Sequence, residues 1–311
     1  MKKLGYIILS LLILLAGFSS CKAFTAADKG FNIVTTGFAP YDFARQITAG
    51  KADLTMLLSP GAESHSYDPS PQDIIKIQKS KIFIYVGGES DAWVDKILDS
   101  IDTSKVKIIT LMDCVELVEE ETVDGMQEEA EEEEEPAYDE HVWTSPRNAK
   151  LIVQKLSEAL CELDTANAEE YKKNTAAYLE KLDALDAKFK AVVAEGSRKT
   201  IIFGDRFPFR YFADAYGLTY YAAFPGCSTE TEPSAATVKF LIDKVKAEKI
   251  PVVFHIEMGN EKMTKVISEA TGAKVLQLHA CHNISRDDFK NGVSYLDIME
   301  KNADALKEAL A

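Results

Sequence analysis

Residues 166–194 read ANAEEYKKNTAAYLEKLDALDAKFKAVVA. Apolar side chains recur there at intervals of three or four, as on one face of a helix: Leu179, Leu182, Leu185 and Phe189. The pattern predicts a single helix of about 29 residues, which is about 43 Å long at the usual rise per residue. Such a helix between two globular halves is a strut that limits hinge motion, and its apolar face should pack against both halves.

The two halves that flank this stretch alternate β-rich runs with helical runs. In the first half the expected strands are 31–37, 53–59, 81–87 and 106–111, and the expected helices are 41–49, 71–79 and 91–99. In the second half the strands are 200–204, 219–224, 251–257 and 274–278, and the helices are 209–216, 234–246, 261–271 and 294–310. Such alternation predicts parallel sheets. We therefore expect an α/β fold of two lobes, 22–165 and 197–311, joined by one long rigid helix at 166–196.

The first 21 residues have the composition of an export signal. Lys2 and Lys3 precede an apolar run at 4–16 that is short for a transmembrane helix, and small residues lead to Cys21. This ending resembles a bacterial lipoprotein signal, which implies that Cys21 is lipidated and anchors the protein to the outer face of the cytoplasmic membrane. The alternative is a cleaved signal with an incidental cysteine. Both interpretations place the mature chain outside the cytoplasm.

The formal net charge of the chain is -15. A protein that binds nucleic acid needs a basic face, so this charge argues against that class and suits a protein that attracts cations. A dense acidic run, 128–135, lies in the segment 116–140 and has no apolar content to order it. That segment is either a solvated insertion or a low-affinity collector of cations. The mature chain of about 290 residues is long enough for two domains, and we expect a monomer.

Four cysteines remain after residue 21, an even number that favours disulfides in an exported protein. We expect the pairs Cys227–Cys281 and Cys114–Cys161, because the members of each pair fall in the same half of the molecule. Each pair would close a loop of roughly 50 residues, which the chain-entropy model values at on the order of 4 kcal/mol. The alternative for Cys281 is a thiolate metal ligand, since it follows His279 by two residues.

Two histidines of the first half lie in loops just before helices. His65 lies in the loop PGAESHSYDPSP, in which Ser70 and Pro71 have the chemistry of a helix N-cap and first turn. His141 lies in DEHVWTSP, residues 139–146, where a serine and a proline repeat this arrangement. A lone histidine is usually structural, but a histidine held by a capped helix is well positioned to bind a metal.

In the second half, Asp205 and His279 each follow a predicted strand. Ligands of α/β sheets bind at the carboxyl ends of strands, so these two groups should meet His65 and His141 in the cleft between the lobes. Imidazole nitrogens with one carboxylate oxygen suit a borderline cation such as zinc, and a closed set of four protein ligands is typical of holding a metal. The alternative for Asp205 is a helix cap or an ion pair with a nearby arginine, Arg206 or Arg210.

From about residue 31 to residue 311 the chain resembles the metal-binding substrate-binding proteins of ATP-binding cassette importers, the cluster A-I proteins of the zinc-uptake and lipoprotein adhesin types. The resemblance rests on APYDFA at 39–44, the His65 loop, DEHVWTSP, TEPS at 231–234 and FHIE at 254–257. It implies two α/β lobes joined by one long helix, a metal site in the cleft between them, and a membrane permease that docks on both lobes. Members often carry a His-rich or acidic loop at the position of 116–140.

The family's first two histidine ligands match His65 and His141. The third family position, usually His or Glu, falls at or next to Asp205, and the fourth, usually Asp, falls at His279. The implied set of three nitrogens and one carboxylate resembles that of the zinc-importing members, whereas manganese members more often use two carboxylates with two histidines. His282 lies on the same loop as His279 and could exchange with it.

His255 and Glu257 lie two residues apart and therefore point to one face of a strand. We expect them to orient a ligand imidazole from behind, or to brace the strand end, more than to bind the metal themselves.

These observations predict a protein that captures one divalent ion and delivers it to a permease for import. Zinc is the expected ion, and manganese or ferrous iron is the alternative. Affinity order alone does not decide between them, because zinc outcompetes manganese at almost any nitrogen site. A zinc hydrolase would need an open coordination position and a general base, and the chain has no His-Glu-x-x-His signature. We therefore expect no enzyme activity.

Overall fold

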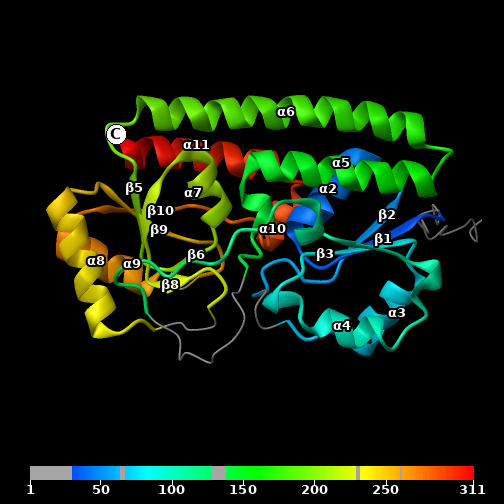
Figure 1. Cartoon of the computed structure of the whole chain (residues 1–311), viewed down its shortest axis with the longest axis horizontal. Helices are drawn as coiled ribbons and strands as arrows, with labels where there is room; N and C mark the ends of the chain where they lie inside the picture. Colours follow the sequence, from blue (N-terminus) through cyan, green and yellow to red (C-terminus); the bar gives the residue numbers. More distant parts are fainter. Residues whose placement is uncertain (1–29, 64–66, 128–137, 229–231, 260) are drawn as a thin grey trace, which may run out of the picture.

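The computed structural model describes residues 30–63, 67–127, 138–228, 232–259 and 261–311. Two α/β lobes lie next to each other, and the predicted long helix, α6 (Ala168–Glu195), runs along both of them (Figure 1). The expected fold class is confirmed. Cys21, His65 and the acidic run 128–135 lie outside the described residues. Within the described part, no helix is both long enough and apolar enough to cross a membrane.

The first lobe contains a four-stranded parallel sheet with the strand order β2-β1-β3-β4. Its strands are β1 (Asn32–Thr35), β2 (Asp53–Met56), β3 (Ile82–Tyr85) and β4 (Lys107–Thr110). Its helices are α2 (Phe38–Thr48), α3 (Pro71–Lys79) and α4 (Trp93–Leu98), with short 3-10 helices η1 (Glu89–Asp91), η2 (Thr103–Lys105), η3 (Met112–Cys114) and η4 (Val142–Thr144). Ile33 and Phe83 in the central strands are fully buried, as in a parallel sheet covered on both faces. Ser70 caps α3 and Pro71 is its first residue, as the sequence predicts.

The second lobe repeats this architecture with the strand order β10-β9-β5-β7. Its strands are β5 (Thr200–Phe203), β7 (Thr219–Tyr221), β9 (Val252–His255) and β10 (Lys274–Gln277). Its helices are α7 (Arg210–Tyr216), α8 (Ala235–Glu248), α9 (Lys262–Thr271), α10 (Arg286–Lys290) and α11 (Tyr295–Leu310). A small parallel pair, β6 (Arg206–Phe207) and β8 (Phe224–Pro225), was not predicted. This pair matters for the site because Asp205 precedes β6 and Cys227 lies two residues after β8.

The two lobes share one apolar core, which runs without interruption from the first lobe through α6 to α11. Helix α5 (Pro146–Leu163) and α2 pack on one part of α6, and α11 packs on another part. Tyr295 at the start of α11 illustrates the junction. Its ring lies 5.0 Å from that of Phe43 in α2, its backbone N–H donates to Asp42 Oδ2 (2.8 Å), and its hydroxyl donates to the carbonyl of Trp143 (2.8 Å). The lobes are therefore joined by much more than one helix.

The predicted disulfides are wrong. All four cysteines of the described residues are free thiols. Cys114 in η3 and Cys161 in α5 lie close to backbone carbonyls of their own surroundings, those of Thr110 (3.4 Å) and Ala168 (3.5 Å). Cys227 lies in the loop after β8, and Cys281 is fully buried in the loop after β10. The prediction used only the even number of cysteines and their position in the same half, and neither property brings two sulfur atoms into bonding geometry.

Candidate metal site

His141 is held by the residues that precede it. Its backbone N–H donates to Asp139 Oδ1 (2.7 Å), and its Nδ1 lies 3.0 Å from the same oxygen. Asp139 is fixed in turn because its carbonyl accepts the hydroxyl of Tyr211 in α7 (2.8 Å). The hydrogen bond to Asp139 assigns the proton of the neutral ring to Nδ1 and the lone pair to Nε2. A carboxylate behind an imidazole is the usual support of a metal-binding histidine.

Burial alone would lower the pKa of His141, whose ring is fully buried. The neighbouring carboxylates of Asp139, Glu140 and Glu120 outweigh burial, so the pKa lies above its usual value. This negative environment favours any positive charge at the ring, which includes a metal ion as well as a proton. A metal ion at this ring would therefore compete with a proton.

His282 lies beside His141, although it belongs to the other lobe. The two ring centroids are 4.6 Å apart with the planes nearly perpendicular (81°). The backbone of His282 is fixed because its carbonyl accepts the N–H of Phe38 at the start of α2 (2.9 Å). Gly37 makes this approach possible, since a Cβ there would lie 3.0 Å from the His282 carbonyl oxygen. The structure thus brings together one imidazole from each lobe.

Glu257 orients His282 from behind. Its Oε1 accepts the His282 backbone N–H (2.9 Å) and lies 3.3 Å from His282 Nδ1, so this ring also carries its lone pair on Nε2. Its Oε2 accepts the Ala280 N–H (2.6 Å). Burial works to raise the pKa of Glu257, but the imidazoles of His279 and His282 and the Ala280 amide outweigh it and hold the pKa well below its usual range. An ionised carboxylate is therefore fixed behind His282.

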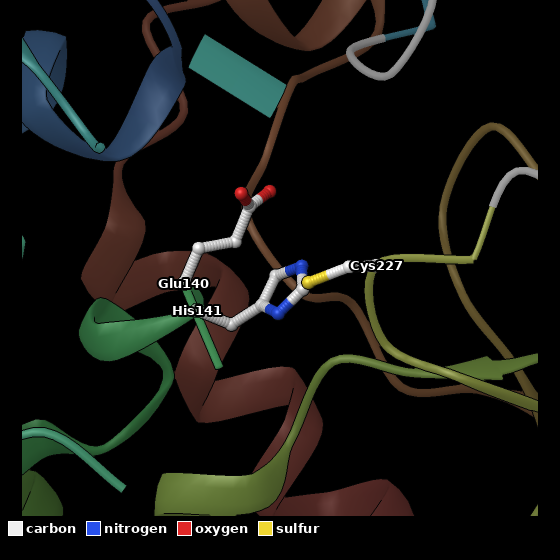
Figure 2. Close-up of side chains that lie close together, drawn as sticks. All are labelled: Glu140, His141 and Cys227. Carbon is white, nitrogen blue, oxygen red and sulfur yellow. The ribbon is translucent and has the colours of Figure 1, made fainter. Parts of the chain in front are cut away.

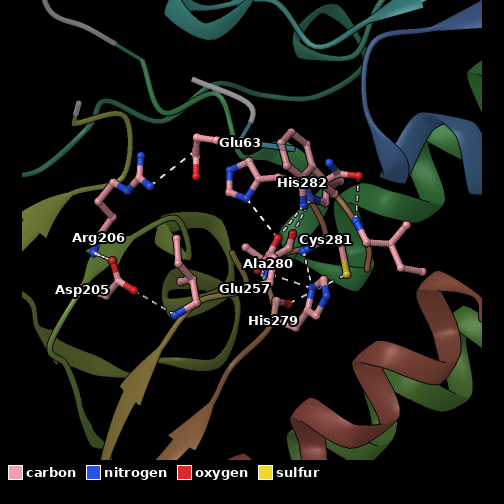
Figure 3. A network of polar contacts seen from close by, with 12 residues as sticks. Glu63, Asp205, Arg206, Glu257, His279, Ala280, Cys281 and His282 are labelled. Carbon is pink, nitrogen blue, oxygen red and sulfur yellow. Dashed lines mark hydrogen bonds and ion pairs between the residues drawn. The ribbon is translucent and has the colours of Figure 1, made fainter. Parts of the chain in front are cut away.

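His279 does not share this arrangement. Figure 3 shows its ring on the opposite side of Glu257 from His282. Its Nδ1 accepts the backbone N–H of Cys281 (3.0 Å), so the ring uses that lone pair inside its own loop, and it lies 3.4 Å from Glu257 Oε2. Burial lowers the pKa of His279, although the Glu257 carboxylate opposes this. We expected His279, in preference to His282, to face the site. This placement does not support that expectation.

Asp205 is held by backbone amides of its own lobe. Its Oδ1 accepts the N–H of Arg206 (2.9 Å) and its Oδ2 accepts the N–H of Ile256 (3.3 Å), which ties the end of β5 to the end of β9 (Figure 3). Burial raises its pKa. His255 Nδ1 lies 2.9 Å from the Ile256 carbonyl, within the same lobe. The structure therefore uses Asp205 and His255 to brace strand ends.

Glu63 and Tyr67, the described residues nearest to His65 on either side, each line a cavity that His282 borders. Glu63 lines a small cavity of about 10 Å³ together with His282 and Glu257. Tyr67 lines a second cavity of about 40 Å³ together with His282 and Glu140. His65 itself lies outside the described residues.

The same loop is fastened to the second lobe. The side-chain amide of Asn283 donates to the carbonyls of Ser59 (2.8 Å) and Ala62 (2.7 Å), and Gly61 N–H donates to the carbonyl of Ile284 (2.8 Å). The guanidinium of Arg206 forms an ion pair with Glu63 across the lobes (3.5 Å). These contacts fix the ends of the His65 loop against the loop of His282.

Cys227, which we expected in a disulfide, lies in this region. One oxygen of Glu140, one ring nitrogen of His141 and the sulfur of Cys227 all lie within 4.8 Å of one another (Figure 2). Burial and the neighbouring carboxylates of Glu140, Glu120 and Asp139 raise the pKa of the Cys227 thiol well above its usual value. The thiol is therefore protonated while no cation is present.

Chemically, the site is a place to hold a cation. Carboxylates surround the two imidazoles, with Glu140 and Asp139 on one side and Glu257 on the other. The nitrogen donors are fixed, buried and supported from behind, which suits tight binding of a borderline metal ion. The negative surroundings raise the local concentration of cations and favour their capture.

Comparison with known proteins gives a consistent result. The model of the family described as zinc-uptake complex component A, periplasmic (ZnuA), matches residues 33–309. The zinc-binding lipoprotein AdcA of Streptococcus pneumoniae serotype 4 is 33% identical over 309 residues, which cover 99% of this chain and 61% of that protein. The chain thus spans about three fifths of the length of that relative. The high-affinity zinc uptake system protein ZnuA of Bacillus subtilis is 31% identical over 308 residues, with 96% of this chain and 94% of that protein covered.

Solved structures agree with this result. The crystal structure of the Zn(II)-bound ZnuA-like domain of Streptococcus pneumoniae AdcA superposes with a TM-score of 0.74 at 32% sequence identity. The match covers 90% of this chain and 98% of that domain.

Proposed function

Because the chain belongs to the family of zinc-uptake complex component A, we propose that it captures zinc outside the cytoplasm and delivers it to an ATP-binding cassette permease for import. The observation that carries the proposal is the meeting of His141 from one lobe with His282 from the other, 4.6 Å apart between ring centroids. Each ring has a carboxylate behind Nδ1, so each offers Nε2 to a metal.

The nitrogen ligands that we propose are His65, His141 and His282. His65 is included because Glu63 and Tyr67, on either side of it, both border cavities lined by His282. His282 replaces the expected His279, whose Nδ1 is occupied by the Cys281 N–H. Asp205 is assigned a bracing role, because its hydrogen bonds join the end of β5 to the end of β9 and its oxygens are not in the close group of Glu140, His141 and Cys227.

Zinc is proposed over manganese because of the ligand atoms. Three imidazole nitrogens form a softer set than the oxygen-rich sites that suit manganese. Manganese or ferrous iron remains the alternative cargo, and a direct competition distinguishes the three ions.

We also propose how the protein is located and what it meets. Lipidation at Cys21 would hold the chain at the outer face of the cytoplasmic membrane, as in relatives named lipoproteins. The chain would act as a monomer, and the outer surfaces of both lobes would dock on the permease. The family is described as a component of an uptake complex and not as an enzyme. We propose that the chain has no hydrolytic role; metal-dependent turnover that disappears in His141→Ala would contradict this.

The experiment is a metal analysis of the protein produced without residues 1–21. We expect one tightly held zinc per chain, and a competitive titration in which zinc displaces manganese and ferrous iron. His141→Ala should lose the bound zinc, whereas Cys114→Ser, outside the site, should keep it. A wild-type protein that holds no zinc, or that prefers manganese under competition, would overturn the proposal.

A further inference from the structure

The carboxylates near the two imidazoles are already committed to other partners. Both oxygens of Glu140 bond to Ser90, one to its backbone N–H (3.0 Å) and one to its hydroxyl. Both oxygens of Glu257 are used by the loop of His282, and both oxygens of Asp205 are used by backbone amides. These hydrogen bonds orient the carboxylates and leave a second lone pair on each oxygen, so the acids alone do not decide which group completes a zinc site. A cysteine thiolate is the softer kind of ligand that zinc also accepts.

Cys227 is placed to be that ligand. Its sulfur, a ring nitrogen of His141 and an oxygen of Glu140 lie within 4.8 Å of one another, and no other trio of His, Cys, Asp or Glu side chains comes this close within the described part of the chain. Cys227 is 9% exposed, so its thiol is not a surface group. Its backbone N–H donates to Glu120 Oε1 (3.0 Å), which fixes its position.

The chain approaches His141 closely at this point. The pairing of β6 with β8 directs residues 226–228 toward His141. A Cβ at Gly226 would lie 3.1 Å from His141 Cε1 and 3.2 Å from Nδ1, so only glycine allows the approach without a shift. The result is that the thiol of the next residue lies against the imidazole.

We propose that Cys227 binds the captured zinc as a thiolate, beside His141 and His282. This inference rests on the proposed function and specifies the site further. On binding, the S–H bond breaks, the proton passes to solvent, and the sulfur lone pair forms the bond to zinc. A His and Cys site of this kind is softer than one with a carboxylate ligand. It therefore favours zinc over manganese through the ligands themselves.

The first test is spectroscopic and uses the wild-type protein without residues 1–21. Zinc X-ray absorption fine structure should show one sulfur neighbour at about 2.3 Å with nitrogens at about 2.0–2.1 Å. The cobalt-loaded protein should show a thiolate-to-cobalt charge-transfer band that is absent in Cys227→Ser and retained in Cys114→Ser. Zinc affinity should fall about 100-fold in Cys227→Ser and stay within threefold in Cys114→Ser.

The two proposals can fail separately. If the wild type binds zinc through nitrogen and oxygen neighbours only, Cys227 is not a ligand and zinc capture still stands. If Cys227→Ser proves unfolded by circular dichroism, the wild-type absorption spectrum still decides the case. If the wild type binds no zinc, the proposed function fails, and the assignment of Cys227 fails with it.

Discussion

His282→Ala would remove the imidazole that meets His141, and His279→Ala is its matched control. Both histidines lie in the loop after β10, both rings lie near Glu257, and they differ in which side of that carboxylate they occupy. Only His282 borders the two cavities that the Glu63 and Tyr67 ends of the His65 loop also line. A loss confined to His282→Ala would therefore identify the side of the loop that binds metal.

The size of the effect follows from the number of ligands. Structural zinc sites bind with apparent free energies of about 10–16 kcal/mol, which is about 3 kcal/mol for each of four ligands. Removing one ligand should therefore weaken zinc binding about 100-fold. His279→Ala removes the acceptor of the Cys281 N–H and the ring beside Glu257 Oε2. We expect it to lower the unfolding free energy by about 1–3 kcal/mol and to change zinc affinity less than tenfold.

The assay is competition for zinc against a chromophoric chelator, with urea unfolding of the metal-free variants measured in parallel. The unfolding measurement distinguishes the loss of a ligand from a loss of stability. His282→Ala should weaken zinc binding by much more than its change in unfolding free energy accounts for. A 100-fold loss in His279→Ala, with His282→Ala within threefold of wild type, would refute our account of this loop.

Three further substitutions test the surroundings of the site in metal-free or zinc-bound protein. Glu257→Gln should weaken zinc binding 10- to 100-fold in the chelator assay, because His282 loses its charged partner. The depressed pKa of Glu257 stabilises the wild-type fold at pH values above the usual pKa of 4.5, and this stability is lost as the pH falls. The urea midpoint should therefore decrease below pH 4.5 in the wild type, and decrease less in the variant. Asp91 is buried near Glu140, and burial is the main cause that raises its pKa from 3.8 to about 7. Its contribution to stability is therefore complete below pH 3.8 and is lost as the pH rises through about 7, by up to about 4 kcal/mol. A urea midpoint in Asp91→Asn that falls over this pH range as steeply as in wild type would contradict this. Asp205→Ala should lower the unfolding free energy by about 1–3 kcal/mol and leave the zinc Kd within tenfold, and a loss of zinc binding without a loss of stability would restore Asp205 as a ligand.

The family resemblance and the fold class were predictable because they depend on long, repeated patterns. The periodicity of residues 166–194 identified α6 to within two residues at its start and one at its end. The Ser70 and Pro71 signals identified α3, whose bounds match the prediction. The β6 and β8 strands have two residues each, too short for any alternation to appear in the sequence.

The site was less predictable because side-chain direction in a loop depends on backbone angles. Cys281 has a φ of +63°, in the left-handed region that a non-glycine residue seldom adopts, and the sequence gives no sign of it. This residue lies between His279 and His282, whose rings end on opposite sides of Glu257. Cys227 was missed because its neighbour His141 is 86 residues earlier in the chain, and only the β6 and β8 pairing brings them together.

The shared core of the lobes has a consequence for the rate at which cargo is exchanged. Swinging one lobe away from the other would separate Tyr295 from Phe43, Asp42 and the Trp143 carbonyl and would expose apolar surface along α6. Loosening the Asn283 contacts would cost only a few hydrogen bonds. If the site holds zinc as we propose, the loops around it should set the barrier to unloading. A permease that strains those loops could accelerate dissociation while the rest of the molecule stays unchanged.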